Sequence, residues 1–149
     1  MNQPDIEIRL MNAVAVLFER DSLLLEYAVG ERAVAAKLGC YLASLFPDHD
    51  VDVEYNRHGL DAKELDLPPE CHGGGEKLIV PDVIVHRRGH DNDNLLVIEV
   101  KKDTNQESRA CDRAKILGMR RYFRYKFGVL LEIPAGPGAK NRRPAMEWL

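Results

Sequence analysis

Three charged residues interrupt two apolar runs in "IVPDVIVHRRGHDNDNLLVIEVKK", residues 79 to 102. The pattern is typical of a β-hairpin whose strands flank the polar loop "RRGHDNDN". A fold symmetric about the loop midpoint, between His90 and Asp91, places Asp82 directly opposite Glu99. Facing residues have Cβ atoms about 4.5–5.5 Å apart, and like charges at that distance repel each other. We therefore expect a cation to compensate this pair.

Lys101 and Glu31 extend the candidate site. Because side chains alternate along a strand, Lys101 shares the face of Glu99. Glu31 precedes Leu38 by almost two helical turns, so it continues the apolar stripe of a predicted helix that covers the hairpin. Three carboxylates near one lysine are typical ligands for a hard cation such as Mg²⁺ or Mn²⁺. In such a site Lys101 would orient or deprotonate a water molecule that attacks a phosphodiester, or stabilise the charged phosphorus centre.

Simpler interpretations of the same residues remain open. Asp82 follows Pro81 and would then only begin a strand, while Glu99 and Lys101 would form an ion pair on an edge strand. Glu31 would only supply a favourable negative charge in the first turn of a helix. Under these interpretations no metal binds.

Periodicity predicts the elements that position these residues. We expect helices at 6–20, 30–46 and 106–121, strands at 51–57, 78–86, 95–101 and 127–133, a long loop at 58–76, and a surface tail at 134–149. The last strand follows a helix and can lie parallel to its neighbour, whereas the hairpin strands are antiparallel. The sequence therefore predicts an α/β fold with a four-stranded mixed sheet flanked by helices.

Apolar stripes indicate which helix faces are buried. The predicted core positions are Leu10, Ala13, Val14 and Leu17 in the first helix, Val34, Leu38, Tyr41, Leu42 and Leu45 in the second, and Ala110, Ala114 and Leu117 in the third. On the third helix, Asp112 and Lys115 either contact the site indirectly or form an i, i+3 surface pair, and we expect the surface pair.

Composition predicts one globular domain, residues 1–149, with 45% hydrophobic and 30% charged residues. The net charge of −3 hides an asymmetry, because residues 1–78 hold 7 Lys/Arg and 15 Asp/Glu while residues 79–149 hold 14 and 9. The basic second half can attract phosphate groups although the whole chain is acidic.

Cysteine spacing and hydropathy bear on the compartment. Cys40, Cys71 and Cys111 are odd in number and widely spaced, so we expect reduced thiols. No apolar run approaches the roughly 20 residues of a membrane helix, and the first residues lack the pattern of a signal peptide. A cytoplasmic location is therefore expected.

The motif "PD" at Pro81–Asp82, followed by "EVK" at 99–101 and preceded by Glu31 on a helix, resembles the PD-(D/E)xK, or restriction endonuclease-like, nuclease superfamily. The predicted αβββαβ order of residues 30 to 133 is similar to the core of that superfamily, and the strings around it resemble a group of small prokaryotic members. The resemblance implies that Asp82, Glu99 and the Val100 carbonyl bind the metal. It also implies that Lys101 is the catalytic lysine and Glu31 an accessory acid.

This resemblance leads us to expect a Mg²⁺- or Mn²⁺-dependent endonuclease, a hydrolase that binds DNA and cleaves its phosphodiester bonds. A homodimer or a partner protein would supply target recognition. Candidate phosphate contacts are Arg87, Arg88, Lys102, Arg120, Arg121 and Arg124. The segment "RRYFRYK", residues 120–126, either binds a nucleic-acid backbone and stacks bases or is a solvated helix end with aromatic anchors.

Two other functions remain open. One is a catalytically inactive nuclease-like module that binds nucleic acid or a partner protein in a defence or repair system. The other is a structural or interaction protein whose hairpin charges form a closed ion-pair network.

Overall fold

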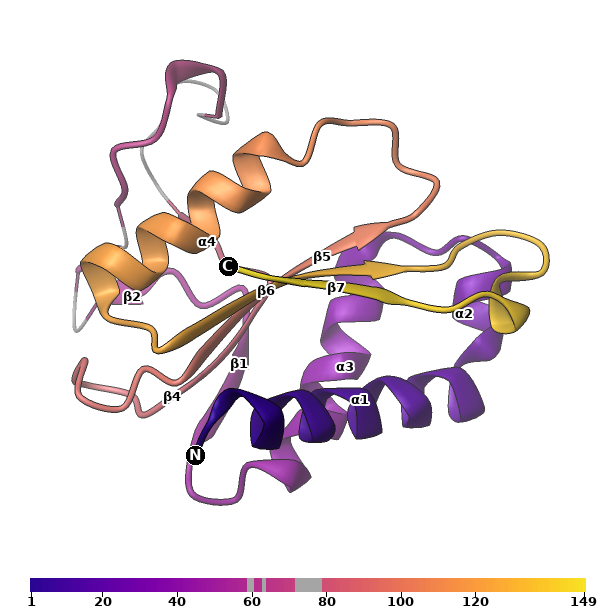
Figure 1. The fold of residues 1–149 in the computed structure, drawn as a ribbon, viewed down its shortest axis with the longest axis horizontal. Coiled ribbons are helices and arrows are strands. Elements are labelled where there is room, and N and C mark those ends of the chain that lie inside the picture. Colours follow the sequence, from indigo (N-terminus) through magenta and orange to yellow (C-terminus); the bar gives the residue numbers. More distant parts are fainter. Residues whose placement is uncertain (59–60, 63, 72–78) are drawn as a thin grey trace.

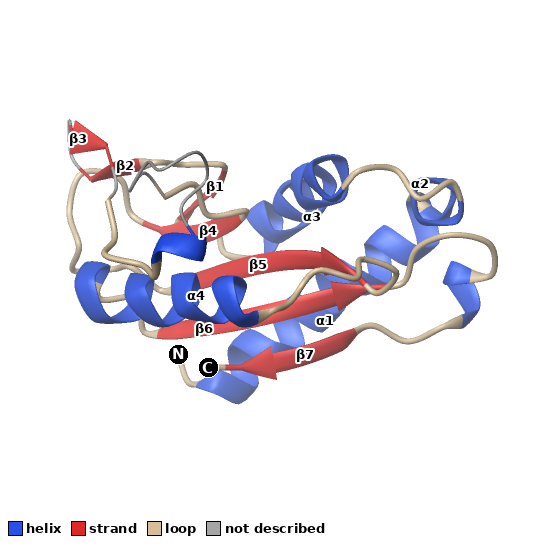
Figure 2. Cartoon of the chain, turned by 90° about the horizontal axis from the view of Figure 1, so that it is seen from above, coloured by secondary structure: helices blue, strands red, loops and turns tan. Residues whose placement is uncertain are grey.

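The computed structural model describes residues 1–58, 61–62, 64–71 and 79–149, and it has an α/β fold with helices on both faces of one mixed sheet (Figures 1 and 2). In the described part of the chain the α-helices are α1 (Gln3–Arg20), α2 (Ser22–Glu26), α3 (Glu31–Leu45) and α4 (Ala110–Phe123). The five strands of the sheet are β1 (Asp50–Val53), β4 (Val83–His86), β5 (Leu96–Lys102), β6 (Phe127–Ile133) and β7 (Ala145–Trp148). The short strands β2 (Arg57–His58) and β3 (Asp61–Ala62) pair with each other outside this sheet. The described residues also form the 3₁₀ turns η1 (Pro69–Cys71) and η3 (Ala139–Asn141).

The sheet has the strand order β1-β4-β5-β6-β7. The pairs β1–β4, β4–β5 and β6–β7 are antiparallel, whereas β5 and β6, which α4 connects, are parallel. The predicted mixed sheet and its parallel last pair are therefore confirmed. The expected number of four strands was wrong, because the segment that we expected to be a surface tail contributes β7.

Strand β7 forms because its side chains alternate between two environments. Met146 and Trp148 pack against the core on the face of α1 and α3. Glu147, between them, points to the other face and forms an ion pair with Arg113 of α4, with 2.9 Å between Nε and Oε1. The Pro/Gly-rich composition before β7 obscured this short alternating run.

Each face of the sheet has its own hydrophobic cluster. On the face of α1, α2 and α3, Val83, Val85, Ile98 and Val100 meet the predicted core residues of α1 and α3. On the face of α4, Ile84, Val97 and Leu130 meet the buried side chains Ile116, Met119 and Phe123.

The predicted core stripe of α4 was only partly correct. Ala114 packs against the cluster on this face, but Ala110 is exposed and Leu117 is 51% exposed, whereas Ile116 and Met119 are fully buried. Leu117 is one of the larger side chains of the segment, but the helix is rotated so that its neighbour Ile116 points at the sheet. This rotation matters for the site, because it decides which polar residues of α4 also face the sheet.

Two glycines allow the helices to approach the sheet closely. A Cβ atom at Gly128 of β6 would lie 2.3 Å from Cγ2 of Ile116 on α4. A Cβ atom at Gly39 of α3 would lie 2.6 Å from Cγ2 of Val53 on β1. Both distances are far below ordinary contact, so the absence of a side chain at these positions sets the spacing of the layers.

A disulfide joins Cys71 to Cys111 and corrects the expectation of three reduced thiols. Residues 64–71 fold back over α4, which brings together two cysteines that are 40 positions apart. Cys40 is a free, exposed thiol. The end of β2, β3 and η1 lie within the described part of the predicted loop 58–76, so the expectation of no regular structure there was wrong. Residues 59–60, 63 and 72–78 lie outside the described residues, and they include residue 78, the predicted start of a strand.

None of the helices in the described part of the chain is long and apolar enough to cross a membrane.

Candidate functional site

The hairpin register brings two carboxylates together. Val83 pairs with Ile98 and Ile84 with Val97, which is the register that the loop midpoint predicts. One step beyond, the backbone N–H of Asp82 donates to Oε1 of Glu99 at 3.3 Å. The two acids are therefore neighbours across β4 and β5, on the face of α4.

Burial and mutual repulsion disfavour the charged forms of this acid pair. Glu99 is 2% exposed, and burial, together with the charge of Asp82, raises its pKa to about 8 despite the opposing effect of Lys115. Burial also raises the pKa of Asp82, although the Val100 N–H donates to its Oδ2 at 2.7 Å and favours the charged form. The site thus holds more negative charge than its surroundings easily stabilise.

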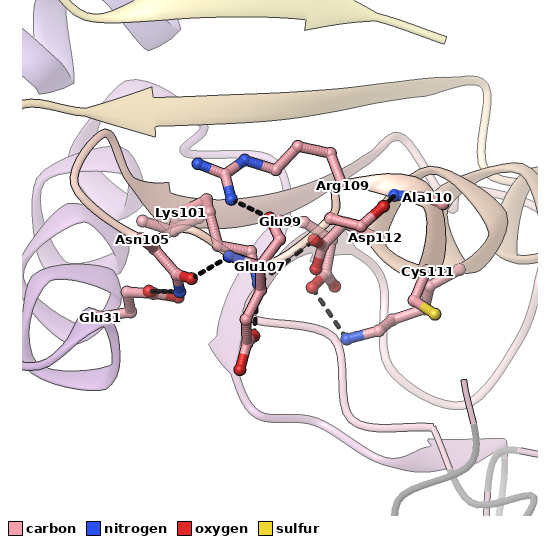
Figure 3. A network of polar contacts seen from close by, with 12 residues as sticks. Glu31, Glu99, Lys101, Asn105, Glu107, Arg109, Ala110, Cys111 and Asp112 are labelled. Atoms are coloured by element: carbon pink, nitrogen blue, oxygen red, sulfur yellow. Dashed lines mark hydrogen bonds and ion pairs between the residues drawn. The ribbon is translucent and has the colours of Figure 1, made fainter. Parts of the chain in front are cut away.

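Two lysines meet acids here, but not in the expected combination; Figure 3 shows Lys101 with its neighbours Glu107 and Asp112. Lys115 of α4 lies against Glu99, with 2.8 Å between Nζ and Oε2. Lys101 of β5 instead points to α4, where its Nζ is 3.2 Å from Oδ2 of Asp112 and 3.9 Å from Oε2 of Glu107. Strand β5 and helix α4 therefore each supply one lysine and one acid, which form two crossed ion pairs.

The expectation that Asp112 and Lys115 form a surface pair was wrong. They precede Ile116, Met119 and Phe123 on the same helical face, with the i, i+3, i+4 spacing that points side chains to the sheet. Burial alone would lower the pKa of Lys115, but the Glu99 carboxylate outweighs it and the net shift is upward. Lys115 is therefore a cation at neutral pH.

Glu31 lies at the start of α3, on the opposite side of the sheet from the acid pair. As expected, α3 packs on β4 and β5, but the hairpin side chains that it covers are apolar ones such as Ile98. Glu31 Oε1 accepts a hydrogen bond from Nδ2 of Asn105 at 2.7 Å, and its negative charge contributes to the raised pKa of Asp82. Its role as an accessory acid stays a prediction.

The donor chemistry of the site fits a hard cation. Asp82 and Glu99 present carboxylate oxygens side by side, and oxygen donors are what Mg²⁺ prefers. However, among residues 1–58, 61–62, 64–71 and 79–149 no three His, Cys, Asp or Glu side chains are grouped closely enough to hold a metal. Glu31 is turned to Asn105, and a lysine contacts Glu99. The Val100 carbonyl as a third ligand stays a prediction.

A cleft of about 550 Å³ opens beside the crossed ion pairs. Lys101, Asp112 and Lys115 line it together with Cys71 and Cys111, so the disulfide forms part of its wall. The charged groups of Lys101, Asp112 and Lys115 are therefore accessible from solvent on the side of α4, although Glu99 itself is buried.

Arg87 and Arg88, two of the predicted phosphate contacts, already bind carboxylates. Arg88 Nε is 2.8 Å from Oδ2 of Asp52, and Arg87 Nε is 3.3 Å from Oδ2 of Asp93. They lie in the hairpin turn, about 15 Å along the strand direction from Asp82. These two arginines stabilise the turn and do not surround the acid pair.

The basic end of α4 lies near the same turn. Phe123 O accepts a hydrogen bond from Nδ2 of Asn94 at 2.5 Å, which holds the end of α4 beside the hairpin loop. Arg120, Arg121 and Arg124 are exposed there, away from the acid pair. Lys102, at the end of β5, has its Nζ 3.4 Å from the carbonyl of Ala28, in the segment between α2 and α3.

The aromatic residues of "RRYFRYK" are mostly anchors. Phe123 is 6% and Tyr125 2% exposed, while Tyr122 is 53% exposed. Two of the three rings are thus covered by the core, which favours a solvated helix end with aromatic anchors over a surface that stacks successive bases.

From the sequence, contact of Asp112 and Lys115 with the site was one of two interpretations, and the surface pair was preferred over it. The signal was present in the helical spacing that joins them to Ile116 and Met119. Comparison of the chain with protein-family models, with curated proteins and with solved structures finds no match.

Proposed function

We propose that this protein is a Mg²⁺- or Mn²⁺-dependent nuclease that hydrolyses phosphodiester bonds of DNA on a PD-(D/E)xK, restriction endonuclease-like core. The observation that carries the proposal is the contact of Asp82 with Glu99 across the β4–β5 pair. Glu99 lies two residues before Lys101 on the same face of β5. The order α3, β1, β4, β5, α4, β6 agrees with the αβββαβ order of that core, with β2 and β3 as an excursion.

Each residue of the site has a task in this proposal. Asp82 and Glu99, with the Val100 carbonyl, bind the metal, and Glu31 contributes negative charge from α3. A divalent cation bound there supplies Lewis-acid stabilisation of the charge that develops on the phosphate. Lys101, whose side chain is 11% exposed at the cleft, positions the attacking water or the phosphate through its ammonium group.

DNA contact is expected to be mainly electrostatic. The exposed Arg121 and Arg124, with Lys102 at the end of β5, offer positive charge to phosphates without contacts that distinguish bases. Binding should therefore weaken steeply with salt. A second copy or a partner protein supplies target selection.

Cleavage assays test the proposal directly. Purified protein is incubated with supercoiled, linear and single-stranded DNA, with Mg²⁺, with Mn²⁺ or with chelator. Asp82→Ala and Lys101→Ala are each expected to lower cleavage by at least about 100-fold while circular dichroism shows a retained fold. Asp48→Ala, which removes an exposed carboxylate elsewhere, is the matched control. Cleavage that persists in both site variants contradicts the proposal.

A non-catalytic module is the second candidate, and the crossed ion pairs favour it. Lys115 with Glu99, and Lys101 with Asp112, leave the site partly neutralised without any metal. In this case Asp82→Ala lowers stability because the Val100 N–H loses its acceptor. Mg²⁺ would not change the melting temperature, and DNA or a partner would bind without metal uptake by calorimetry.

A further inference from the structure

Helix α4 places a lysine against the acid pair. Lys115 Nζ is 2.8 Å from Oε2 of Glu99 and 3.4 Å from the carbonyl oxygen of Val80, just before β4. The ammonium group therefore bridges the two strands of the hairpin at the point where Asp82 and Glu99 meet. Its side chain is 23% exposed, so it reaches this position from the cleft.

The second lysine of the site does not share this task. Lys101 is held by Asp112 and Glu107, which balance its charge on the α4 side. Among the described residues, Lys115 is the cationic side chain in ion-pair contact with Glu99. One positive charge thus faces two carboxylates, which is fewer than a divalent cation would supply.

We infer that Lys115 is the resident counter-cation of the Asp82–Glu99 pair and competes with a divalent metal ion for the oxygen atoms of Glu99. The inference rests on the proposed function, because it requires the acid pair to be the metal site. A metal ion that binds Glu99 displaces the ammonium group of Lys115. The flexible stem of the lysine then allows the freed charge to move into the cleft, where it attracts an anionic group such as a phosphate.

Metal titration by calorimetry tests the competition. Mn²⁺ and Mg²⁺ are titrated separately into chelator-stripped wild type, Lys115→Met, Lys115→Arg and Lys126→Met. Lys115→Met is expected to bind metal at least tenfold more tightly than wild type, because the competing charge is gone. Lys115→Arg should stay within about threefold of wild type. Lys126→Met, which removes the same charge from an exposed position, should also match wild type. Should Lys115→Met fail to fold, Lys115→Gln keeps a hydrogen-bond donor for Glu99 and gives the same comparison.

A second measurement does not depend on activity. Without metal and at pH 8, where Glu99 begins to ionise in the folded state, Lys115→Met leaves its carboxylate uncompensated, so the melting temperature should fall below that of wild type. Saturating Mn²⁺ should then raise it by more degrees than in wild type. Adding Glu99→Gln should restore the metal-free melting temperature and abolish the metal response.

The outcomes separate the two proposals. If wild type binds metal and Lys115→Met binds no more tightly, Lys115 does not compete and the inference fails while the metal site stands. If neither protein binds metal, the acid pair is not a metal site, and the proposed function fails together with the inference. Tighter binding by Lys115→Met with unchanged control variants supports both.

Discussion

Replacing Glu99 with glutamine is expected to stabilise the protein at alkaline pH. Burial and the neighbouring Asp82 raise the pKa of Glu99 from 4.5 to about 8. Between these values the folded state holds a proton that the unfolded state releases, so stability is fully present below about pH 4.5 and is lost as the pH rises through 8. At about 1.4 kcal/mol per pH unit, this loss amounts to about 5 kcal/mol.

Glutamine has nearly the same shape as the protonated acid and cannot ionise. Glu99→Gln should therefore match wild type near pH 5, and its advantage in free energy of unfolding should grow by about 1.4 kcal/mol per unit up to pH 8. Urea unfolding at pH 5, 6, 7, 8 and 9, in buffer with chelator, measures this difference. The control Glu107→Gln removes the same charge from a side chain that is 80% exposed and should change little at any pH.

One result would refute the reasoning. If Glu99→Gln is less stable than wild type at pH 8 to 9, the ion pair with Lys115 outweighs burial and the repulsion from Asp82. Glu99 would then be held in its charged form.

Three further expectations concern the scaffold. Removal of the disulfide, by reduction or by the double variant Cys71→Ser/Cys111→Ser, should lower the free energy of unfolding by about 4 kcal/mol, because the bridge joins residues 40 positions apart and restricts the unfolded chain. Cys40→Ser is the control. Equal melting temperatures of the double variant and the wild type would contradict a formed bridge. Leu38→Ala, at a fully buried position of α3, should cost about 2–5 kcal/mol in urea unfolding. Asp52→Asn should lower the free energy of unfolding by about 2 kcal/mol at pH 7. Burial raises the pKa of Asp52, but the hydrogen bonds from Arg88 and His86 outweigh burial and lower it, so the stabilisation is present above pH 4 and is lost as the pH falls through the folded pKa. A loss of stability that persists at pH 2 would contradict this account.

Local patterns were sufficient for much of the architecture. The alternation in the hairpin and the length of its loop predicted the register that sets Asp82 beside Glu99. The apolar stripes of α1 and α3 were also correct, because several aliphatic residues recur there at helical spacing. These features depend on neighbours in sequence, which a single chain displays directly.

Other features depend on contacts between distant segments. Strand β7 is stabilised by pairing with β6, and the cysteine bridge depends on the path of residues 64–71, so neither is visible in local periodicity. The rotation of α4 depends on what the helix packs against. Because Leu117 was chosen over Ile116 as a core residue, a surface position was preferred for Lys115 over contact with the site, and the structure shows the opposite.

The glycine at position 128 makes the electrostatics of the site sensitive to a neutral residue. Because α4 approaches β6 through the missing side chain, a methyl group there meets Ile116, the neighbour of Lys115 in the chain. Gly128→Ala would therefore force Ile116 to shift without altering any charge. The packing that holds Lys115 beside Glu99 thus depends in part on a residue that carries no side chain.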